Sequence, residues 1–205
     1  MGALRATARS VQDARNELNR LDAIAGDGDL GVTMAAAADA ILGLPADVPG
    51  RSSEAALRQA GLEIAKRAPS TAGTLVATAL LAAARVETRT GEGIVAAIAS
   101  RAAAAQHAIE DRGHAKVGDK TMLDAIGPLV ASLEESARAG IPLKRALVDA
   151  AGAAREGAEH TRALRARVGR AGWLADRSDG NEDAGAHLVA LVAKAAADYI
   201  ARLSE

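Results

Sequence analysis

The chain has 205 residues, and its 25 lysine and arginine residues nearly balance 26 aspartate and glutamate residues, for a formal net charge of −1. This balance excludes a general nucleic-acid-binding protein, which needs an excess of basic residues to displace counterions. The chain contains no cysteine, which excludes disulfides, thiolate metal sites and a cysteine nucleophile. Its length suits one globular domain, and we expect residues 1–205 to form a single one.

Aromatic residues make up only 1% of the chain, whereas hydrophobic residues make up 49%. A core of Ala, Leu, Val and Ile suits closely spaced helices better than the aromatic-rich faces of β-sheets, so the composition predicts an all-α protein. The first 12 residues lack the continuous apolar stretch of a secretory signal. The longest apolar run, residues 75–84, is too short to span a bilayer. We therefore expect a cytoplasmic protein without a membrane segment.

Helical patterning extends over most of the sequence and is interrupted where Gly, Pro and Asp cluster. It predicts eight helices, over about residues 3–20, 32–42, 52–67, 71–88, 92–111, 121–138, 142–165 and 184–203. Ser52 or Ser53, and the hydroxyls of Ser70 and Thr71, are placed to cap the third and fourth helices. The fourth helix is apolar on nearly all sides, and we expect it to be central.

Three loops, 21–31, 113–121 and 166–185, carry most of the unusual residues. If successive helices run up and down, each of these loops and the break at 69–71 follows an odd-numbered helix. All four connections then lie at the same end. The sequence therefore predicts an eight-helix antiparallel bundle with a functional site at one open end.

The first of these loops contains three carboxylates within eight residues, those of Asp22, Asp27 and Asp29, with glycines around them. In a partly buried loop such charges repel one another by a few kcal/mol unless cations lie between them. Glycines permit a left-handed backbone and close approach, so the side chains can converge on a point. This pattern favours a hard divalent metal ion, although a solvated Asp-Gly turn is the common alternative for such a triplet.

Two familiar motifs do not explain this loop. Residues 26–31 satisfy the G-x-G-x-x-G pattern of dinucleotide-binding folds, but no strand precedes them and two aspartates would repel the phosphates. An EF-hand beginning at Asp27 would place Gly31, Val32 and Ala38 where an oxygen ligand, a glycine and a glutamate are needed. Contact with phosphate through Mg²⁺ remains, because Mg²⁺ prefers carboxylate and phosphate oxygens.

The other two loops contain basic residues. Residues 113–121 nearly match the Walker phosphate loop, but Asp119 stands between Gly118 and Lys120 and no strand precedes the segment. A loop with a capping Asp or Thr is the plainer interpretation. Residues 165–183 combine arginines, glycines and the single Trp. Arginines facing an acidic metal loop could bind the oxygens of a phosphoryl group, or could serve solubility alone.

Three segments together resemble the signature segments of the nucleotide-binding L subunit of dihydroxyacetone kinase, the DhaL type. They are residues 21–34 (LDAIAGDGDLGVTM), 118–125 (GDKTMLDA) and 169–178 (GRAGWLADRS), the last followed by DAGA at 183–186. Their order and spacing match across essentially the whole chain. The resemblance implies an eight-helix antiparallel barrel whose open end binds ADP or ATP through two Mg²⁺ ions, with Asp22, Asp27 and Asp29 as the metal ligands.

The same resemblance implies which residues surround the nucleotide. They are Leu30, Gly31, Val32, Thr33, Ser70, Thr71, Ala72, Gly113, Met122, Arg170, Asp183, Ala184 and Gly185. Arg170 is the expected catalytic residue, through contact with the transferred phosphoryl group. The four histidines are expected to have surface or capping roles.

The resemblance also implies a partner, a separate K subunit or domain that holds the sugar as a covalent adduct. Two phosphoryl donors stay open: ATP that exchanges after each turnover, or a retained ADP that is rephosphorylated by a phosphotransferase-system phosphocarrier subunit. No second domain is fused in the sequence, which favours separate subunits and the second donor. A nucleotide-loaded interaction module, read by a regulator, is the alternative function.

Several positions depart from the family pattern. Leu30 stands where His or Cys is common, Trp173 where Tyr is common, and Ala184 where Pro is common. Gly172 and Asn181 likewise replace Ser and His. The metal ligands and Arg170 are retained, so the departures bear on donor and acceptor rather than on nucleotide binding. The acceptor is open between dihydroxyacetone and another short ketose, such as a tetrulose.

Overall fold

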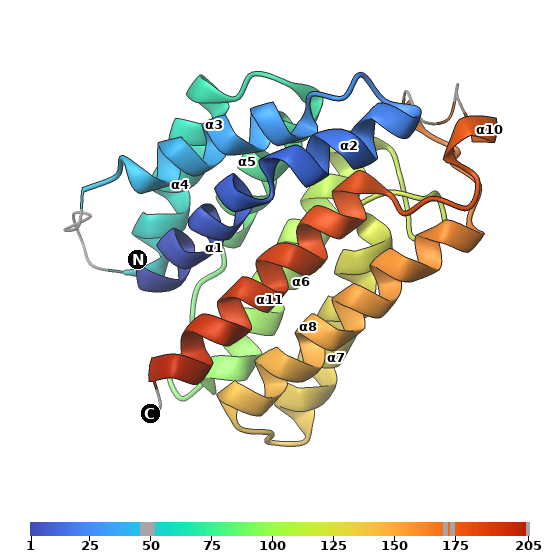
Figure 1. Ribbon diagram of the computed structural model, residues 1–205. Coiled ribbons are helices and arrows are strands. Elements are labelled where there is room, and N and C mark those ends of the chain that lie inside the picture. Colours follow the sequence, from blue (N-terminus) through green and yellow to red (C-terminus); the bar gives the residue numbers. More distant parts are fainter. Residues whose placement is uncertain (46–51, 170–171, 173–174, 204–205) are drawn as a thin grey trace.

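The computed structural model describes residues 1–45, 52–169, 172 and 175–203, and in these residues it contains helices and loops but no strand (Figure 1). The all-α class predicted from composition is confirmed. The α-helices are α1 Gly2–Asp13, α2 Arg15–Ala25, α3 Leu30–Leu42, α4 Ser53–Arg67, α5 Thr71–Ala83, α6 Ile94–Gly113, α7 Leu123–Arg138, α8 Leu143–His160, α10 Ala175–Ser178 and α11 Ala184–Leu203, with a 3₁₀ turn, η1, at Thr161–Ala163.

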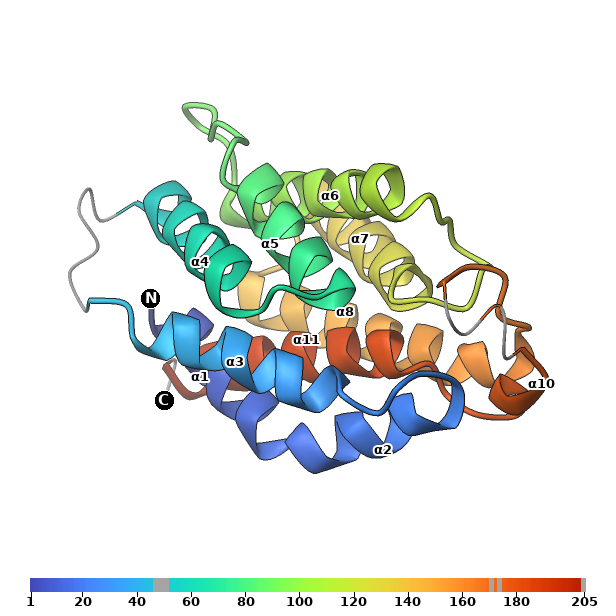
Figure 2. The same ribbon diagram turned by 90° about the horizontal axis from the view of Figure 1, so that it is seen from above.

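The long helices pack mainly against their neighbours in the sequence. Helix α3 contacts α1 and α4, the contacts then continue in order from α4 to α8, and α11 contacts both α8 and α1. Among the described helices these contacts form a closed ring. Figure 2 shows the α2–α3 connection, the α6–α7 connection and α10 gathered at one end of the molecule.

The first predicted helix, 3–20, is two helices in the structure. The backbone at Ala14 (φ −84°, ψ 4°) separates α1 from α2, and α2 continues to Ala25. Leu18 and Leu21 of α2 are buried in the core, so tertiary packing extends the helix into the predicted loop. The expected boundary was therefore wrong, and Asp22 lies on a helix rather than in a loop.

Other predicted ends also shift, while the predicted caps are confirmed. Ser52 and Ser70 each accept a bond from the backbone N–H three residues later, at 3.1 Å in both cases. Helix α5 ends at Ala83 rather than near 88. Helix α8 ends at His160, where the fully buried hydroxyl of Thr161 donates to a carbonyl in the last turn and the chain tightens into η1.

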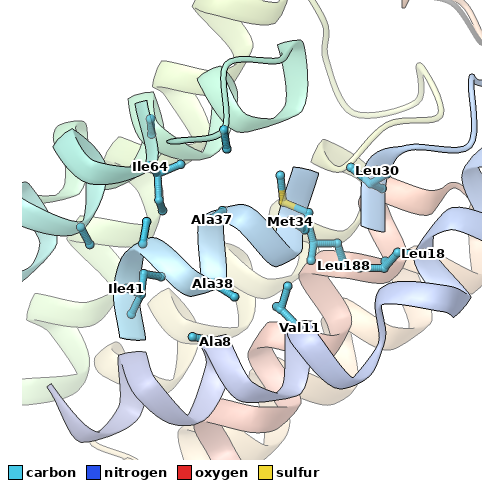
Figure 3. Close-up of a cluster of buried hydrophobic side chains, with 14 of the residues drawn as sticks. Ala8, Val11, Leu18, Leu30, Met34, Ala37, Ala38, Ile41, Ile64 and Leu188 are labelled. Carbon is cyan, nitrogen blue, oxygen red and sulfur yellow. The ribbon is translucent and has the colours of Figure 1, made fainter. Parts of the chain in front are cut away.

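The most buried helix is α3, not α5. Figure 3 shows Met34, Ala37 and Ile41 of α3 among side chains of α1, α4 and α11, and these residues belong to one buried cluster. By contrast, only Gly73, Ala77 and Ala83 of α5 are buried. The expectation that the most uniformly apolar helix would be central was wrong: the first turns of α5 line a cavity, and most of its later residues are only half-buried.

Alanine is prominent in the buried contacts between α7, α8 and α11, where Leu129 and Val189 pack beside it. A second buried cluster consists of Ala125 from α7, Ala154 and Ala158 from α8, and Ala186 and Ala190 from α11. Such small side chains let helix backbones approach closely. The packing expected from an alanine-rich, aromatic-poor composition is thus observed.

Helix α11 is long and apolar enough, by length and composition alone, to cross a membrane, a property that core helices share. In the structure it contacts α1, α2, α7 and α8. It therefore packs against other helices of the bundle. The expected absence of a membrane segment stays a prediction.

Two glycines on the same helix give a matched test of the contact between α7 and α8. A Cβ at Gly157 would lie 2.2 Å from the carbonyl oxygen of Asp124, whereas a Cβ at Gly152 would meet nothing within 4 Å. Gly157→Ala should lower the free energy of unfolding by about 2–3 kcal/mol because α8 must move away from α7. Gly152→Ala should raise it by about 0.5–1 kcal/mol. Urea unfolding of the two variants measures both effects, and equal behaviour would contradict the close contact.

Candidate functional site

A cavity of about 1060 Å³ lies where four connections meet. Its lining comes from the α2–α3 connection, the residues around the start of α5, the α6–α7 loop, and residues 168–169, 178 and 181–185. These are the four segments that helix counting placed at one end. Their predicted convergence is observed.

Three carboxylates form one wall of this cavity. Asp22, Asp27 and Asp29 each place one carboxylate oxygen within 4.8 Å of those of the other two. Asp22 is half-buried, and the other two side chains are exposed. Hard oxygen ligands around a common point are the donors that Mg²⁺ and Ca²⁺ prefer. The wall therefore fits a divalent cation, which would also relieve the repulsion between these charges.

Asp22 is held in place by the start of the next helix. Its Oδ2 accepts three backbone hydrogen bonds, at 2.9, 3.0 and 3.3 Å, from Gly28, Asp29 and Leu30. Asn19, one turn earlier on α2, accepts two more, at 2.7 and 3.2 Å, from Gly31 and Val32. The N-cap residue of α3 makes no side-chain cap bond of its own. Helix α2 thus supplies the caps of α3 and fixes the acidic loop between them.

Two glycines allow this loop to turn back on itself. A Cβ at Gly26 would lie 2.3 Å from Oδ1 of Asp22, so only glycine permits the close approach seen there. Gly28 has a φ of +77°, a left-handed conformation that other residues adopt at a cost. The glycines therefore act as the sequence predicts, by letting the carboxylates converge.

Another wall of the cavity is apolar. Leu75 of α5, Ile109 of α6 and Met122 line the cavity and belong to one hydrophobic cluster. Met122 is 9% exposed, so it serves both the core and the cavity surface. A cavity with one carboxylate wall and one apolar wall suits a ligand that has a flat apolar ring and an anionic end bound through metal.

Buried carboxylates shape the loop between α6 and α7. Asp124 accepts bonds from the backbone N–H of Gly118 at 2.6 Å and of Thr121 at 2.8 Å. Asp119 accepts one from the N–H of Lys116 at 3.0 Å. Both carboxylates are at most 6% exposed. Met122, the N-cap residue of α7, makes no side-chain cap bond. Of the two expected capping residues, Thr121 contacts the start of α7, because its hydroxyl accepts a bond from the N–H of Leu123 at 3.2 Å, whereas Asp119 bonds within the loop.

Asp183 caps α11 at the cavity wall. Its Oδ1 accepts a bond from the N–H of Ala186 at 2.7 Å, and its own N–H donates to the hydroxyl of Thr161 at 2.9 Å. Burial, together with the neighbouring charge of Asp124, raises the pKa of Asp183 to about 7. The expectation of an N-cap at this position is confirmed.

The adjacent Glu182 ties α11 to α8. Burial alone would raise the pKa of Glu182, but its contacts with Arg155 at 2.7 Å and with His187 at 3.0 Å lower it below its usual value. Arg162 adds a second ion pair at 3.1 Å. His187 therefore has a structural role, in line with the expectation for the histidines.

Most of the predicted nucleotide contacts line the cavity, namely Leu30, Thr33, Ser70, Thr71, Ala72, Gly113, Met122, Asp183, Ala184 and Gly185. Gly31 and Val32 are not among the described lining residues. Both lie in the first turn of α3, and their backbone N–H groups donate to Asn19 of α2. Arg170 lies outside the described residues, so its catalytic role stays a prediction.

The lining residues that sequence analysis missed include Leu75, Ile109 and Lys120. Helical spacing carries a signal for the first two, because each lies four residues from a predicted contact on the same helix and so shares its face. Lys120 carries no such signal. Its inward direction depends on a backbone φ of +62°, which sequence spacing does not reveal.

The bonds to Asp22 predict a loss of stability that is independent of metal. Asp22→Ala leaves three amides without their acceptor and should lower the free energy of unfolding by about 1–2 kcal/mol. Asp29→Ala is the matched control, because that side chain makes no cap bond to α3. Urea unfolding in the presence of a chelator measures both variants. An equal loss in the two would show that the bonds to Asp22 contribute nothing.

The raised pKa of Asp183 predicts a dependence of stability on pH. Between about pH 4 and pH 7 the folded chain keeps a proton that the unfolded chain releases, so this contribution is complete at low pH and is lost as pH rises through about 7. Asp183→Asn removes the titration and keeps an acceptor for α11. From about pH 5 to pH 8 the stability of the variant should fall less than that of the parent, by about 2–3 kcal/mol, because each pH unit below the raised pKa is worth about 1.4 kcal/mol. Parallel pH profiles would contradict this assignment.

The comparisons with known proteins agree with this geometry. Residues 24–198 match the family model described as the DAK2 domain. The D-erythrulose kinase of Mycolicibacterium smegmatis is 38% identical over 202 residues, which are 97% of this chain and 34% of that protein. The PEP-dependent dihydroxyacetone kinase 1, ADP-binding subunit DhaL, of Listeria innocua is 30% identical over 185 residues, 89% of this chain and 86% of that subunit.

A solved structure shows the same fold. The dihydroxyacetone kinase of C. freundii in complex with AMP-PNP and Mg²⁺ superposes with a TM-score of 0.75 at 30% identity, over 96% of this chain and 33% of that one. This chain thus spans about a third of the length of that kinase and of the D-erythrulose kinase. Since the family model covers most of the sequence and the Listeria subunit matches over most of both chains, this chain belongs to the DAK2 domain family as a DhaL-type dihydroxyacetone kinase domain.

Proposed function

We propose that this chain is the nucleotide-binding domain, residues 1–205, of a kinase that phosphorylates a short ketose in the cytoplasm. ADP or ATP lies in the cavity, with its base on the apolar wall and its phosphates facing the carboxylates through Mg²⁺. The observation that carries this proposal is the cavity of about 1060 Å³, which combines the carboxylates of Asp22, Asp27 and Asp29 with the apolar surface of Leu75, Ile109 and Met122.

The three aspartates would hold two Mg²⁺ ions. When bound, Mg²⁺ neutralises the phosphate oxygens and aligns the phosphoryl group for transfer. Oδ2 of Asp22 is engaged by three amides, so Oδ1 is the oxygen that can ligate the metal. The chain's own contribution is to hold these oxygens in a fixed array before the nucleotide arrives.

The start of α5 supplies a second contact for phosphate. Ser70 accepts a bond from the N–H of Gly73, which leaves its hydroxyl proton for donation to a phosphate oxygen. Thr71 opens the helix, whose N-terminal partial charge favours anions. Arg170 completes the site in this proposal by binding the charge that develops on the moving phosphoryl group.

The acceptor is a short ketose presented by a K-type sugar-binding subunit or domain. Relatives over most of this chain include kinases named for D-erythrulose and for L-erythrulose, from Mycolicibacterium smegmatis and Pectobacterium atrosepticum. These relatives, together with the departures at Leu30 and Ala184, support a tetrulose beside dihydroxyacetone as acceptor. Phosphate transfer to erythrulose and to dihydroxyacetone, measured with a K-type partner added, tests the proposal directly. Nucleotide binding without transfer to either sugar would instead favour an interaction module.

The phosphoryl donor can be identified by testing whether the purified protein retains bound nucleotide. After denaturation, stoichiometric ADP in the supernatant would support a retained nucleotide that a phosphotransferase-system phosphocarrier recharges. Absence of nucleotide, with turnover sustained by added ATP, would assign the ATP-exchanging mode.

If Asp29 is a metal ligand, its substitution should weaken nucleotide binding without lowering the stability of the fold. Asp29→Asn should weaken binding of Mg²⁺-ADP by about tenfold or more, because one anionic ligand is lost, while stability without ligand stays level or rises slightly as repulsion is relieved. Calorimetric titration with Mg²⁺-ADP and chelator-treated urea unfolding measure the two effects. A sharp loss of stability without ligand would mean that the Asp29 carboxylate is structural.

A further inference from the structure

Lys120 lies on the cavity wall but directs its charge into the protein. It is only 3% exposed, and its Nζ donates to the carbonyl oxygen of Leu164 at 3.0 Å and to that of Ser178 at 2.6 Å. Hydrogen bonds from an ammonium group are stronger than those between neutral groups. One side chain therefore joins two points of the chain that lie far from it in sequence.

The backbone around Lys120 is built to turn this side chain inward. Its φ of +62° is a left-handed conformation that long side chains seldom adopt. Asp124 holds the loop on both sides of it, through the amides of Gly118 and Thr121. A residue in such a conformation persists only where its surroundings fix it, and it commonly marks a functional position.

The two carbonyls that Lys120 binds bracket part of the cavity wall. Leu164 follows η1, and Ser178 is the last residue of α10. Between them lie Val168 and Gly169, which line the cavity. The neighbouring backbone adds a third link, in which the N–H of Arg167 donates to the carbonyl oxygen of Asp119 at 3.2 Å.

Acidic neighbours balance the buried charge. Burial lowers the pKa of Lys120, and the charges of Asp179 and Asp183 oppose that shift, while Arg162 adds to it. Asp183 also lines the cavity and caps α11. Lys120 thus connects the α6–α7 loop to the chain at Leu164 and at Ser178 and, through charge, to the start of α11.

We propose that Lys120 is a positioning residue that holds the described parts of the 164–178 segment, residues 164–169 and 175–178, in place at the cavity and thereby sets the affinity for nucleotide. The proposal rests on the proposed function for its ligand, but the contacts themselves are made without one. Lys120 does not touch the phosphates in this role; it acts through Val168 and Gly169.

Limited trypsin digestion without nucleotide tests whether Lys120 holds this segment in place. Arg165, Arg167 and Arg177 lie within the segment and report its opening. Lys120→Met keeps the length and apolar stem but removes both hydrogen bonds, so cleavage at these arginines should be about tenfold faster. Lys116→Met is the matched control, because Lys116 is an exposed lysine of the same loop, and in this variant cleavage at the three arginines should proceed at the rate of the parent. Unchanged cleavage in Lys120→Met overturns the proposal.

A second measurement separates positioning from mere stability. Calorimetric titration with Mg²⁺-ADP should show affinity about tenfold weaker in Lys120→Met than in Lys116→Met, and with a K-type partner the KM for nucleotide should rise while kcat stays within about twofold. Faster cleavage with unaltered affinity for Mg²⁺-ADP would mean that Lys120 has only a structural role and would overturn its positioning role.

Two controls keep the outcomes distinct. Should Lys120→Met fail to fold by circular dichroism, Lys120→Gln replaces it, since glutamine is too short to reach both carbonyls and carries the same expectation. If the parent chain does not bind Mg²⁺-ADP, the proposed function fails and the proposed control of affinity fails with it, whereas the digestion still decides whether Lys120 holds the segment.

Discussion

The carboxylate of Asp22 is the group on which the site depends. Its Oδ2 binds three amides at the start of α3, where the helix carries partial positive charge, so a negative charge is stable at that point. The same residue belongs to the carboxylate cluster with Asp27 and Asp29. Attraction to the helix start therefore holds together charges that would otherwise repel one another and separate.

The remaining walls are built by different means. The α6–α7 loop is shaped by Asp119 and Asp124, whose oxygens are engaged by backbone amides rather than by cations. The start of α11 is fixed by Asp183 and by the ion pairs of Glu182. Acidic residues thus occur on several sides of one cavity, and among the described residues those on the α2–α3 side are the group whose carboxylate oxygens lie within 4.8 Å of one another. Acidic composition alone does not distinguish the carboxylate wall that fits a cation from the other walls. The hydrogen-bond partners of the other carboxylates make that distinction.

Much of this arrangement could be predicted from the sequence, because its signals are local. Ser52 and Ser70 act as caps, glycines surround the converging aspartates, and helix counting brings the four connections together. What escaped prediction depends on distant contacts. Burial of Leu21 accompanies the extension of α2 past residue 20, and the first turns of α5 line the cavity rather than the core. The orientation of Lys120 follows from a backbone conformation imposed by Asp124, which no spacing rule encodes.

The alanine contacts between α7, α8 and α11 limit how this protein can change. Alanine has no rotamers to lose when it is buried, so the three helices meet at almost no side-chain entropy cost. At these alanine positions no side chain can move aside for a larger residue, and Gly157 leaves still less room. A larger residue is therefore better tolerated on the outer faces of these helices and in the loops than at these positions, so the helices that support the cavity can be kept while its loops change.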